Sequence, residues 1–234
     1  MNTRTSSSSL RLPATLLLAG QLLYILITQL HTGGDANHHP SVFAEYAHSG
    51  TWGLVHLGQF AAVAILLAGL LALYSALDLP TPAARWAGRY GAASAAVALA
   101  LYGALQAVDG VALKQAVTAW ANAPEAEKAA RFASAEAIRW LEWGMRSYQD
   151  YVTGVALLLF AAAVIGSSRL PRPIGHLMGL SGLAYLAQGW VAGSQGFSEA
   201  QSIAIVLAWI LDLAWMIWLV LLSRRTRERV AQLA

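Results

Sequence analysis

The chain has 234 residues, of which 57% are hydrophobic and only 12% are charged. About 25% of the residues of an ordinary soluble domain are charged, so this composition excludes such a domain and indicates a multi-pass membrane protein. The net charge of +3 gives no indication of nucleic-acid binding, and the absence of cysteine excludes disulfides, thiolate metal sites and a cysteine nucleophile.

Six apolar segments predict an all-α integral membrane protein, a bundle of six transmembrane helices. Each segment is close to the roughly 20 residues that a helix needs to cross a bilayer. The segments are 13–30, 52–77, 84–108, 148–165, 174–192 and 203–223. Residues 1–12 are expected to form a disordered cytoplasmic tail, 13–223 the bundle, and 224–234 a basic cytoplasmic tail. External connections are expected to contain helices at about 41–48 and 111–137.

Basic residues predict the orientation of the bundle. Arginines gather in both tails and in the connections after the second and fourth segments. They are Arg4, Arg11, Arg85, Arg89, Arg169, Arg172, Arg224, Arg225, Arg227 and Arg229. The opposite connections carry fewer basic residues, all of them in the longest one. By the positive-inside rule, both termini are expected to be cytoplasmic, which agrees with an even number of spans.

The stretch EYAHSGTWGLVHLGQF at 45–60 carries a polar helix face. Glu45, His48, Trp52, His56 and Gln59 fall within about 80° of one another if the helix is continuous. A glycine at position 50 is the weak point of that helix, because glycine disfavours a helix interior. The outer residues of this face could simply anchor the helix in the headgroups. The deeper ones favour a cavity or a protein interior.

Other segments carry polar residues near the same external depth, whereas their inner halves are apolar. The first segment has Gln21, Tyr24, Thr28 and His31, the third has Tyr102, Gln106 and Asp109, and the fifth has Tyr185 and Gln188. Polar residues that converge at one depth predict a cavity open to the outside. The predicted lining is Glu45, His56, Gln59, Gln106, Asp109, Glu142, Arg146 and Asp150.

The fourth helix has a ladder of alternating charges, spaced for ion pairs along one face. Its members are Glu136, Arg139, Glu142, Arg146 and Asp150. Arg146 and Asp150 must enter the membrane, so we expect them to pair, with Glu142 as a further partner. The ladder could be a clamp between helices. Alternatively, Arg146 binds an anion or carbonyl group while Glu142 or Asp150 acts as acid or base.

Asp212 lies within the last apolar segment, about 14 Å from its start. A carboxyl group at that depth is a functional candidate, and a structural hydrogen bond to a tyrosine or glutamine of a neighbouring helix explains it equally well. His38, His39 and His48, together with His31, Asp35 and Glu45, could form a metal site of nitrogen and oxygen ligands, although NHHP could be only a polar turn. The sequence indicates no particular cofactor.

Three functions remain open. The first is an acid–base enzyme for a lipid-like or isoprenoid substrate, the second a binding or proton-coupled transport protein, and the third a structural subunit. The catalytic candidates are Glu45, His56, Asp109, Glu142, Arg146 and Asp150. The substrate-binding candidates are Gln59, Gln106, Tyr102, Tyr24, Gln188 and Asp212. The expected partners are membrane lipids and a lipid-like small molecule, and the oligomeric state is not indicated.

Three stretches resemble those of uncharacterised six-helix bacterial membrane proteins of the domain-of-unknown-function type. They are NHHPSVFAEYAHSGTWGLVHLGQF, QAVDGVALKQAVTAW and RWLEWG. The resemblance covers most of the chain and implies a location in the bacterial inner membrane. It implies no activity.

Overall fold

The computed structural model describes residues 4–31 and 33–232, and side chains within 10–31 and 33–224. All regular structure in these residues is helical, which confirms the all-α class. The elements are α1 (Arg4–Thr28), α2 (His39–His48), α3 (Trp52–Ala76), α4 (Pro82–Gln106), the π-helical turn η1 (Ala107–Leu113), α5 (Lys114–Ala121), α6 (Glu125–Ile165), α7 (Arg172–Gln195) and α8 (Glu199–Gln232).

Within the described residues, 5 helical stretches are long and apolar enough to cross a membrane. They are Leu10–Thr28, Trp52–Ala76, Pro82–Ala121, Glu125–Ile165 and Glu199–Arg224. The chain is therefore a multi-pass helical membrane protein by length and composition. Helix α7, which covers the predicted fifth span, is not among the five. Its many glycine, serine and glutamine residues lower its hydropathy.

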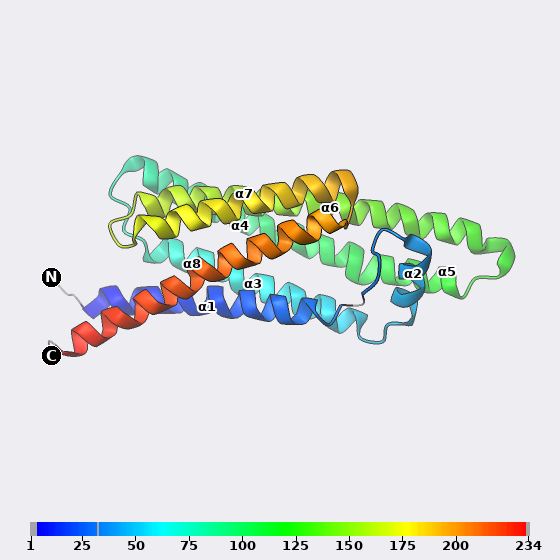
Figure 1. Cartoon of the computed structure of the whole chain (residues 1–234), viewed down its shortest axis with the longest axis horizontal. Coiled ribbons are helices and arrows are strands. Elements are labelled where there is room, and N and C mark those ends of the chain that lie inside the picture. The colour runs from blue at the N-terminus through cyan, green and yellow to red at the C-terminus, as the bar shows by residue number, and fades with distance from the viewer. Residues whose placement is uncertain (1–3, 32, 233–234) are drawn as a thin grey trace.

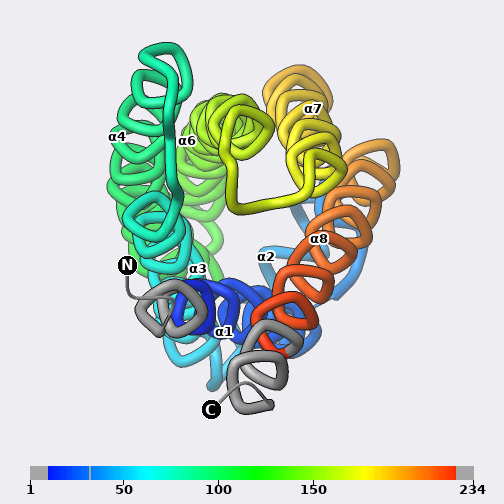
Figure 2. Tube along the Cα trace, turned by 90° about the vertical axis from the view of Figure 1, so that its left-hand side faces the viewer, coloured from blue at the N-terminus to red at the C-terminus, as the bar shows by residue number. Residues whose placement is uncertain are grey.

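Six long helices in the described part of the chain form a closed ring in the order α1, α3, α4, α6, α7, α8, each packed against the next (Figures 1 and 2). Both chain termini lie at one end of the bundle, and we call the opposite end, near α2 and α5, the distal end (Figure 1). The half nearer the termini holds the main apolar core, which includes the buried side chains of Leu17, Leu70, Phe160 and Trp215. The distal half contains the polar side chains discussed below.

The disordered tail predicted for residues 1–12 is wrong where the structure describes it. Helix α1 begins at Arg4 and includes Pro13 within its length. Helix formation is cooperative, so an apolar segment can extend its helix through the polar residues that precede it. Residues 1–3 lie outside the described part of the chain.

The helices expected at about 111–137 are not separate elements. Helix α5 continues α4 through η1, giving an uninterrupted helical stretch from Pro82 to Ala121. Helix α6 has 41 residues, or about 60 Å at 1.5 Å per residue. That is about twice the 30 Å thickness of a hydrocarbon core. The distal parts of these helices therefore form a hairpin that extends beyond the rest of the bundle (Figure 1).

Lys114 joins this hairpin to α2. Its Nζ donates to the backbone oxygens of Tyr46, Ala47 and Ser49 at 2.6, 2.8 and 2.9 Å. These carbonyls lie at the C-terminal end of α2, where Tyr46 has only a 3.3 Å bond from the Ser49 N–H and where positive charge is favourable. The ammonium group thus caps α2 and holds it against the hairpin.

We expect Lys114→Met to loosen α2, because three carbonyl oxygens lose their donor. Hydrogen exchange of the α2 amides, measured by mass spectrometry in detergent, should become at least about tenfold faster, which corresponds to about 1.4 kcal/mol. Lys128→Met is the control, since Lys128 is half-exposed and lies 3.8 Å from Glu125. Equal exchange in the two variants would contradict the capping role.

Candidate functional site

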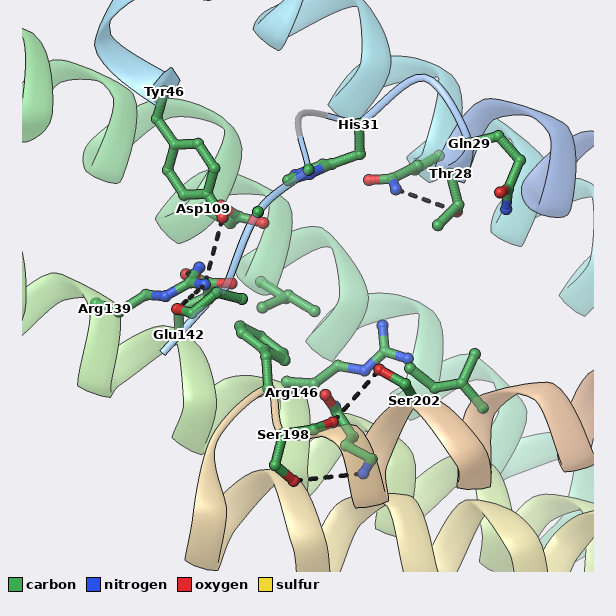
Figure 3. A pocket seen from close by; sticks show the side chains of 18 of the residues that line it. Thr28, Gln29, His31, Tyr46, Asp109, Arg139, Glu142, Arg146, Ser198 and Ser202 are labelled. Atoms are coloured by element: carbon green, nitrogen blue, oxygen red, sulfur yellow. Dashed lines mark hydrogen bonds and ion pairs between the residues drawn. The ribbon is translucent and has the colours of Figure 1, made fainter. Parts of the chain in front are cut away.

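A partly open cavity of about 660 Å³ lies in the distal half of the bundle (Figure 3). Residues of α1, α2, α3, α4, η1, α6 and α8 line it, together with the connections before α2 and α8. Its lining includes Tyr24, Thr28, His31, Tyr46, Gln59, Tyr102, Leu105, Gln106, Asp109, Arg139, Glu142, Arg146, Ile205 and Trp209. We call this space the distal cavity.

The polar face predicted across residues 45–59 is interrupted. Helix α2 ends at His48, and Ser49 has an extended conformation with ψ of 116°, so the two helices do not share a continuous face. On α3, Trp52, His56 and Gln59 are buried. On α2, Glu45 and His48 are exposed. Glu45 does not line the distal cavity, so the structure does not support its predicted catalytic position.

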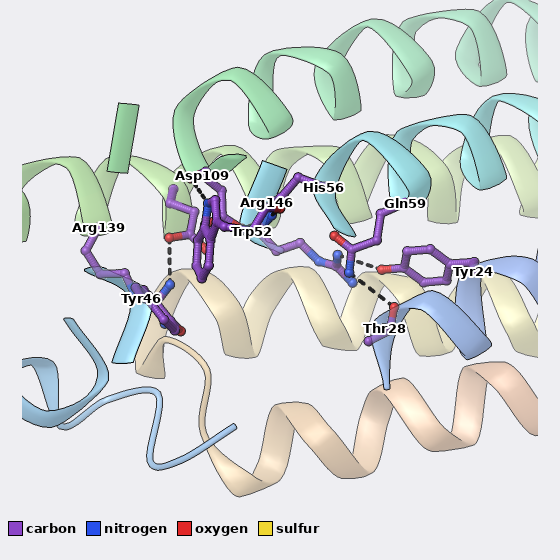
Figure 4. A network of polar contacts seen from close by, with 10 residues as sticks. Tyr24, Thr28, Tyr46, Trp52, His56, Gln59, Asp109, Arg139 and Arg146 are labelled. Atoms are coloured by element: carbon purple, nitrogen blue, oxygen red, sulfur yellow. Dashed lines mark hydrogen bonds and ion pairs between the residues drawn. The ribbon is translucent and has the colours of Figure 1, made fainter. Parts of the chain in front are cut away.

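His56 and Asp109 form a close pair between α3 and η1 (Figure 4). The His56 Nε2 lies 3.0 Å from the Asp109 Oδ2, and the His56 Nδ1 lies 2.8 Å from the Trp52 carbonyl oxygen. One helical turn deeper, the Gln59 amide donates to the Thr28 hydroxyl at 3.3 Å. Two elements thus bring His56, Gln59 and Asp109 together, but only Gln59 and Asp109 line the distal cavity, so the predicted lining position of His56 is wrong.

The charge ladder on α6 pairs differently from the expectation. Glu142 bonds to Arg139, with Nη1 to Oε2 at 2.7 Å, rather than to Arg146. Glu136 contacts a different helix, α2, with its Oε1 at 2.9 Å from the His39 Nδ1. The Arg139–Glu142 pair is inside the protein, since the two side chains are 2% and 3% exposed. A buried charge of this kind is tolerated only when it is paired.

Arg139 also connects α6 to the distal loops. Its Nη2 donates to the Ala36 carbonyl oxygen at 3.1 Å and to the Tyr46 hydroxyl at 3.4 Å. Its guanidinium carbon lies 4.6 Å from the centroid of the Phe197 ring. Burial raises the pKa of Tyr46 to about 12, so its phenol is neutral at pH 7. Arg139 and Tyr46 line the cavity, yet the sequence does not single them out as site residues.

The predicted pair of Arg146 and Asp150 is confirmed, with Nε to Oδ2 at 2.9 Å. Arg146 Nη1 also donates to the Tyr24 hydroxyl of α1 at 3.2 Å. Arg146 lines the distal cavity, whereas Asp150 lines a second cavity of about 30 Å³ beneath it. Gln188 shares this smaller space and donates to the Ala204 carbonyl oxygen at 3.3 Å. Asp150 and Gln188 therefore do not line the distal cavity themselves, and they stabilise its wall from the smaller cavity beneath it.

Asp212 does not line either of these two cavities. Its carboxylate accepts hydrogen bonds from Trp215 Nε1 at 3.1 Å and from the Tyr185 hydroxyl at 3.3 Å. This is the structural alternative left open by the sequence, a carboxyl group bonded to a tyrosine of a neighbouring helix. The predicted role of Asp212 in substrate binding has no support from this position.

Of the histidines predicted as metal ligands, His38, His39 and His48 do not belong to a ligand cluster in the described part of the chain. His38 Nδ1 lies 2.7 Å from the Ser41 hydroxyl, and His48 Nδ1 lies 2.7 Å from the Ala44 carbonyl oxygen. The His39 Nδ1 lies 2.9 Å from the Glu136 Oε1, so this nitrogen is already hydrogen-bonded. The contact of His38 therefore lies at the start of α2, that of His48 at its end, and that of His39 packs α2 against α6.

The fold and this distal cavity define a multi-pass helical membrane protein with buried ion pairs around a large recess. The family model described as a domain of unknown function (DUF4386) matches residues 47–222, so the chain belongs to that family. The resemblance drawn from the sequence is thereby confirmed at the family level. No curated protein and no solved structure matches the chain.

Proposed function

We propose that this protein is a membrane enzyme that binds a lipid-like or isoprenoid molecule in the distal cavity and performs acid–base chemistry on it. The observation that carries the proposal is the composition of the cavity wall. Charged groups of Asp109, Glu142 and Arg146 share one space with the apolar side chains of Leu105 and Ile205. Ligand sites commonly combine an apolar lining with a few polar groups that converge.

Arg146 is suited to hold an anionic or carbonyl head group. Its Nε and Nη1 are used by Asp150 and Tyr24, which fix the guanidinium plane. A guanidinium has five N–H donors, so others remain for a ligand in the cavity. Planar donors of this kind bind carboxylate and phosphate with two hydrogen bonds.

The pair of His56 and Asp109 supplies the acid–base function through Asp109, which lines the distal cavity, while His56 lies behind it and outside the lining. Histidine changes its protonation state near neutral pH, and a carboxylate at 3.0 Å orients its ring and stabilises the imidazolium. Glu142 is a second carboxylate at the same cavity, paired with Arg139. Glu45 takes no part, because it is exposed and outside the cavity lining.

The proposal includes six membrane crossings, with α7 as the sixth, and both termini in the bacterial cytoplasm. Support comes from the arginine-rich connections and tails, the position of both termini at one end, and the packing of α7 between α6 and α8. In this orientation the distal cavity opens outside the inner membrane. The apolar core of the other half disfavours a transport path to the cytoplasm.

The test is the lipid retained by protein purified in mild detergent and measured by native mass spectrometry. We expect Arg146→Gln/Asp150→Asn to retain at least about tenfold less of the bound species than the wild type. The double change avoids leaving the fully buried Asp150 as an unpaired charge. Arg131→Gln is the control, because Arg131 pairs with Glu127 on the exposed part of α6.

The catalytic half of the proposal needs a second measurement. Conversion of the retained molecule, followed by its mass over time, should be lost in Asp109→Asn while retention persists. Equal retention in the double variant and the wild type would overturn the binding site. Equal conversion in Asp109→Asn and the wild type would overturn the acid–base assignment.

A further inference from the structure

A cluster of three side chains at the edge of the distal cavity has the composition of a metal site. His31 follows α1, His56 lies in α3 and Asp109 lies in η1. Each offers one ligand atom, and these atoms all lie within 4.8 Å of one another. The rings of His31 and His56 have their centroids 5.2 Å apart. The cluster therefore joins three segments that are distant in the sequence.

The hydrogen bonds of His56 determine which of its nitrogens faces the cluster. A carbonyl oxygen can only accept, so Nδ1, at 2.8 Å from the Trp52 carbonyl oxygen, carries the proton. In a neutral ring, Nε2 then directs a lone pair at the Asp109 carboxylate 3.0 Å away. Two acceptors at that distance require a shared proton or a cation between them.

Metal-bound histidines have this same arrangement. They usually donate their second ring N–H to a backbone carbonyl or a carboxylate, which fixes the tautomer and the ring orientation. The second carboxylate oxygen of Asp109, Oδ1, is buried and has no hydrogen-bond partner within the described residues. A proton alone would satisfy one of these oxygens. A cation would bind the carboxylate and both imidazoles together.

The backbone around Asp109 is shaped to bring it to His56. A Cβ atom at Gly110 would lie 2.8 Å from the His56 Cβ, so only glycine permits this approach of η1 to α3. Trp52 Nε1 donates to the Asp109 carbonyl oxygen at 3.2 Å and holds the turn from the other side. A π-helical turn of this kind often marks a functional site.

We propose that His31, His56 and Asp109 bind one divalent transition-metal ion, with zinc as the best fit. Two imidazoles and one carboxylate form a usual ligand set of catalytic zinc, and a fourth position then stays open. Bonds of about 2.1 Å in a tetrahedron place ligand atoms about 3.4 Å apart, so small side-chain rotations would close the cluster. His31 and Asp109 line the distal cavity, which gives the open position access to a ligand there.

This site does not depend on the proposed lipid binding, but it replaces the acid–base assignment, because with an ion bound His56 and Asp109 would be its ligands instead of a proton-transferring pair. An ion would take the place of the proton shared by His56 and Asp109. The head group of a bound molecule, or a water, would complete its coordination. Binding of the ion can be measured on protein stripped of lipid, so failure of one proposal leaves the other standing.

The experiment is zinc content by elemental mass spectrometry, on protein carrying a tag without histidine. Each sample is stripped with a chelator, equilibrated with a slight excess of zinc chloride and desalted. We expect about one zinc per wild-type chain, and at least tenfold less in His56→Ala, His31→Ala and Asp109→Asn. His38→Ala and His48→Ala are the matched controls, because both histidines are exposed and outside the cluster.

The isosteric variant Asp109→Asn separates ligand loss from misfolding. Its folding is checked by circular dichroism and gel filtration in detergent before the zinc measurement. Wild type that retains no more zinc than folded Asp109→Asn would overturn the site. The same conclusion would follow if the two control variants lost as much zinc as the cluster variants.

Discussion

Arg139→Met is expected to lower the free energy of unfolding by about 3–5 kcal/mol. Removing the guanidinium leaves Glu142 buried, with 3% of its side chain exposed, and without the counter-ion that lies 2.7 Å away in the wild type. The Tyr46 hydroxyl and the Ala36 carbonyl oxygen lose a donor as well. The measurement is an unfolding titration with sodium dodecyl sulfate from mild detergent micelles.

Two variants show whether this loss of stability comes from the buried Glu142 carboxylate that is left without its counter-ion. Arg139→Met/Glu142→Met removes both charges at similar volume, and we expect it to recover most of the lost stability. Arg131→Met removes an exposed partner of Glu127 and should cost only about 0–1 kcal/mol. A loss in Arg139→Met no larger than that in Arg131→Met would show that the buried pair does not stabilise this half of the bundle.

Gly182→Ala is expected to destabilise the protein by about 1–3 kcal/mol, the usual cost of forcing extra volume into a packed core. Helices α6 and α7 approach closely along a seam of small residues. Gly175, Gly182 and Gly189 recur every seven residues on α7. Cβ atoms added there would lie 2.9, 2.9 and 2.7 Å from the backbone oxygens of Ala161, Gly154 and Ser147, in that order. Backbone cannot move aside as a side chain can, so the helices would have to separate.

Gly179→Ala provides a control on the same helix. Its added Cβ would lie 3.6 Å from the Ala161 Cβ, an ordinary van der Waals contact. Alanine favours a helix over glycine by up to about 1 kcal/mol, so this variant should be neutral or more stable. The same detergent titration compares the two, and equal effects would contradict a role for the close approach of α6 and α7.

Much of the helical framework is predictable because it depends on local composition. Long apolar runs indicate helices, since lipid requires each segment to satisfy its own backbone hydrogen bonds. The confirmed pair of Arg146 and Asp150 is local for the same reason, because residues four apart share a helix face. The local pattern gives a different result at residues 4–12, because their polar composition predicts a disordered tail although α1 begins at Arg4.

The candidate site is less predictable because its parts meet across the ring of helices. The break after His48 removes Glu45 from the face that carries His56. Arg139 lies one turn before Glu142, so its position in the charge ladder is a signal that could have identified it as a partner. For Tyr46 no such signal is available, because its contact with Arg139 spans 93 residues of sequence.

The sequence by itself determined the class of this protein: all-helical, multi-pass and membrane-bound, with charges on α6 close enough to pair along one helix. Hydropathy and helical spacing suffice for these features, because both act over a few turns. Only the tertiary structure decided which polar groups share a space. It joined His31, His56 and Asp109 from three segments, paired Glu142 with Arg139, and placed Asp212 away from the cavity. These outcomes depend on how the helices are rotated and how closely they pack, which glycines such as Gly110 permit at single positions.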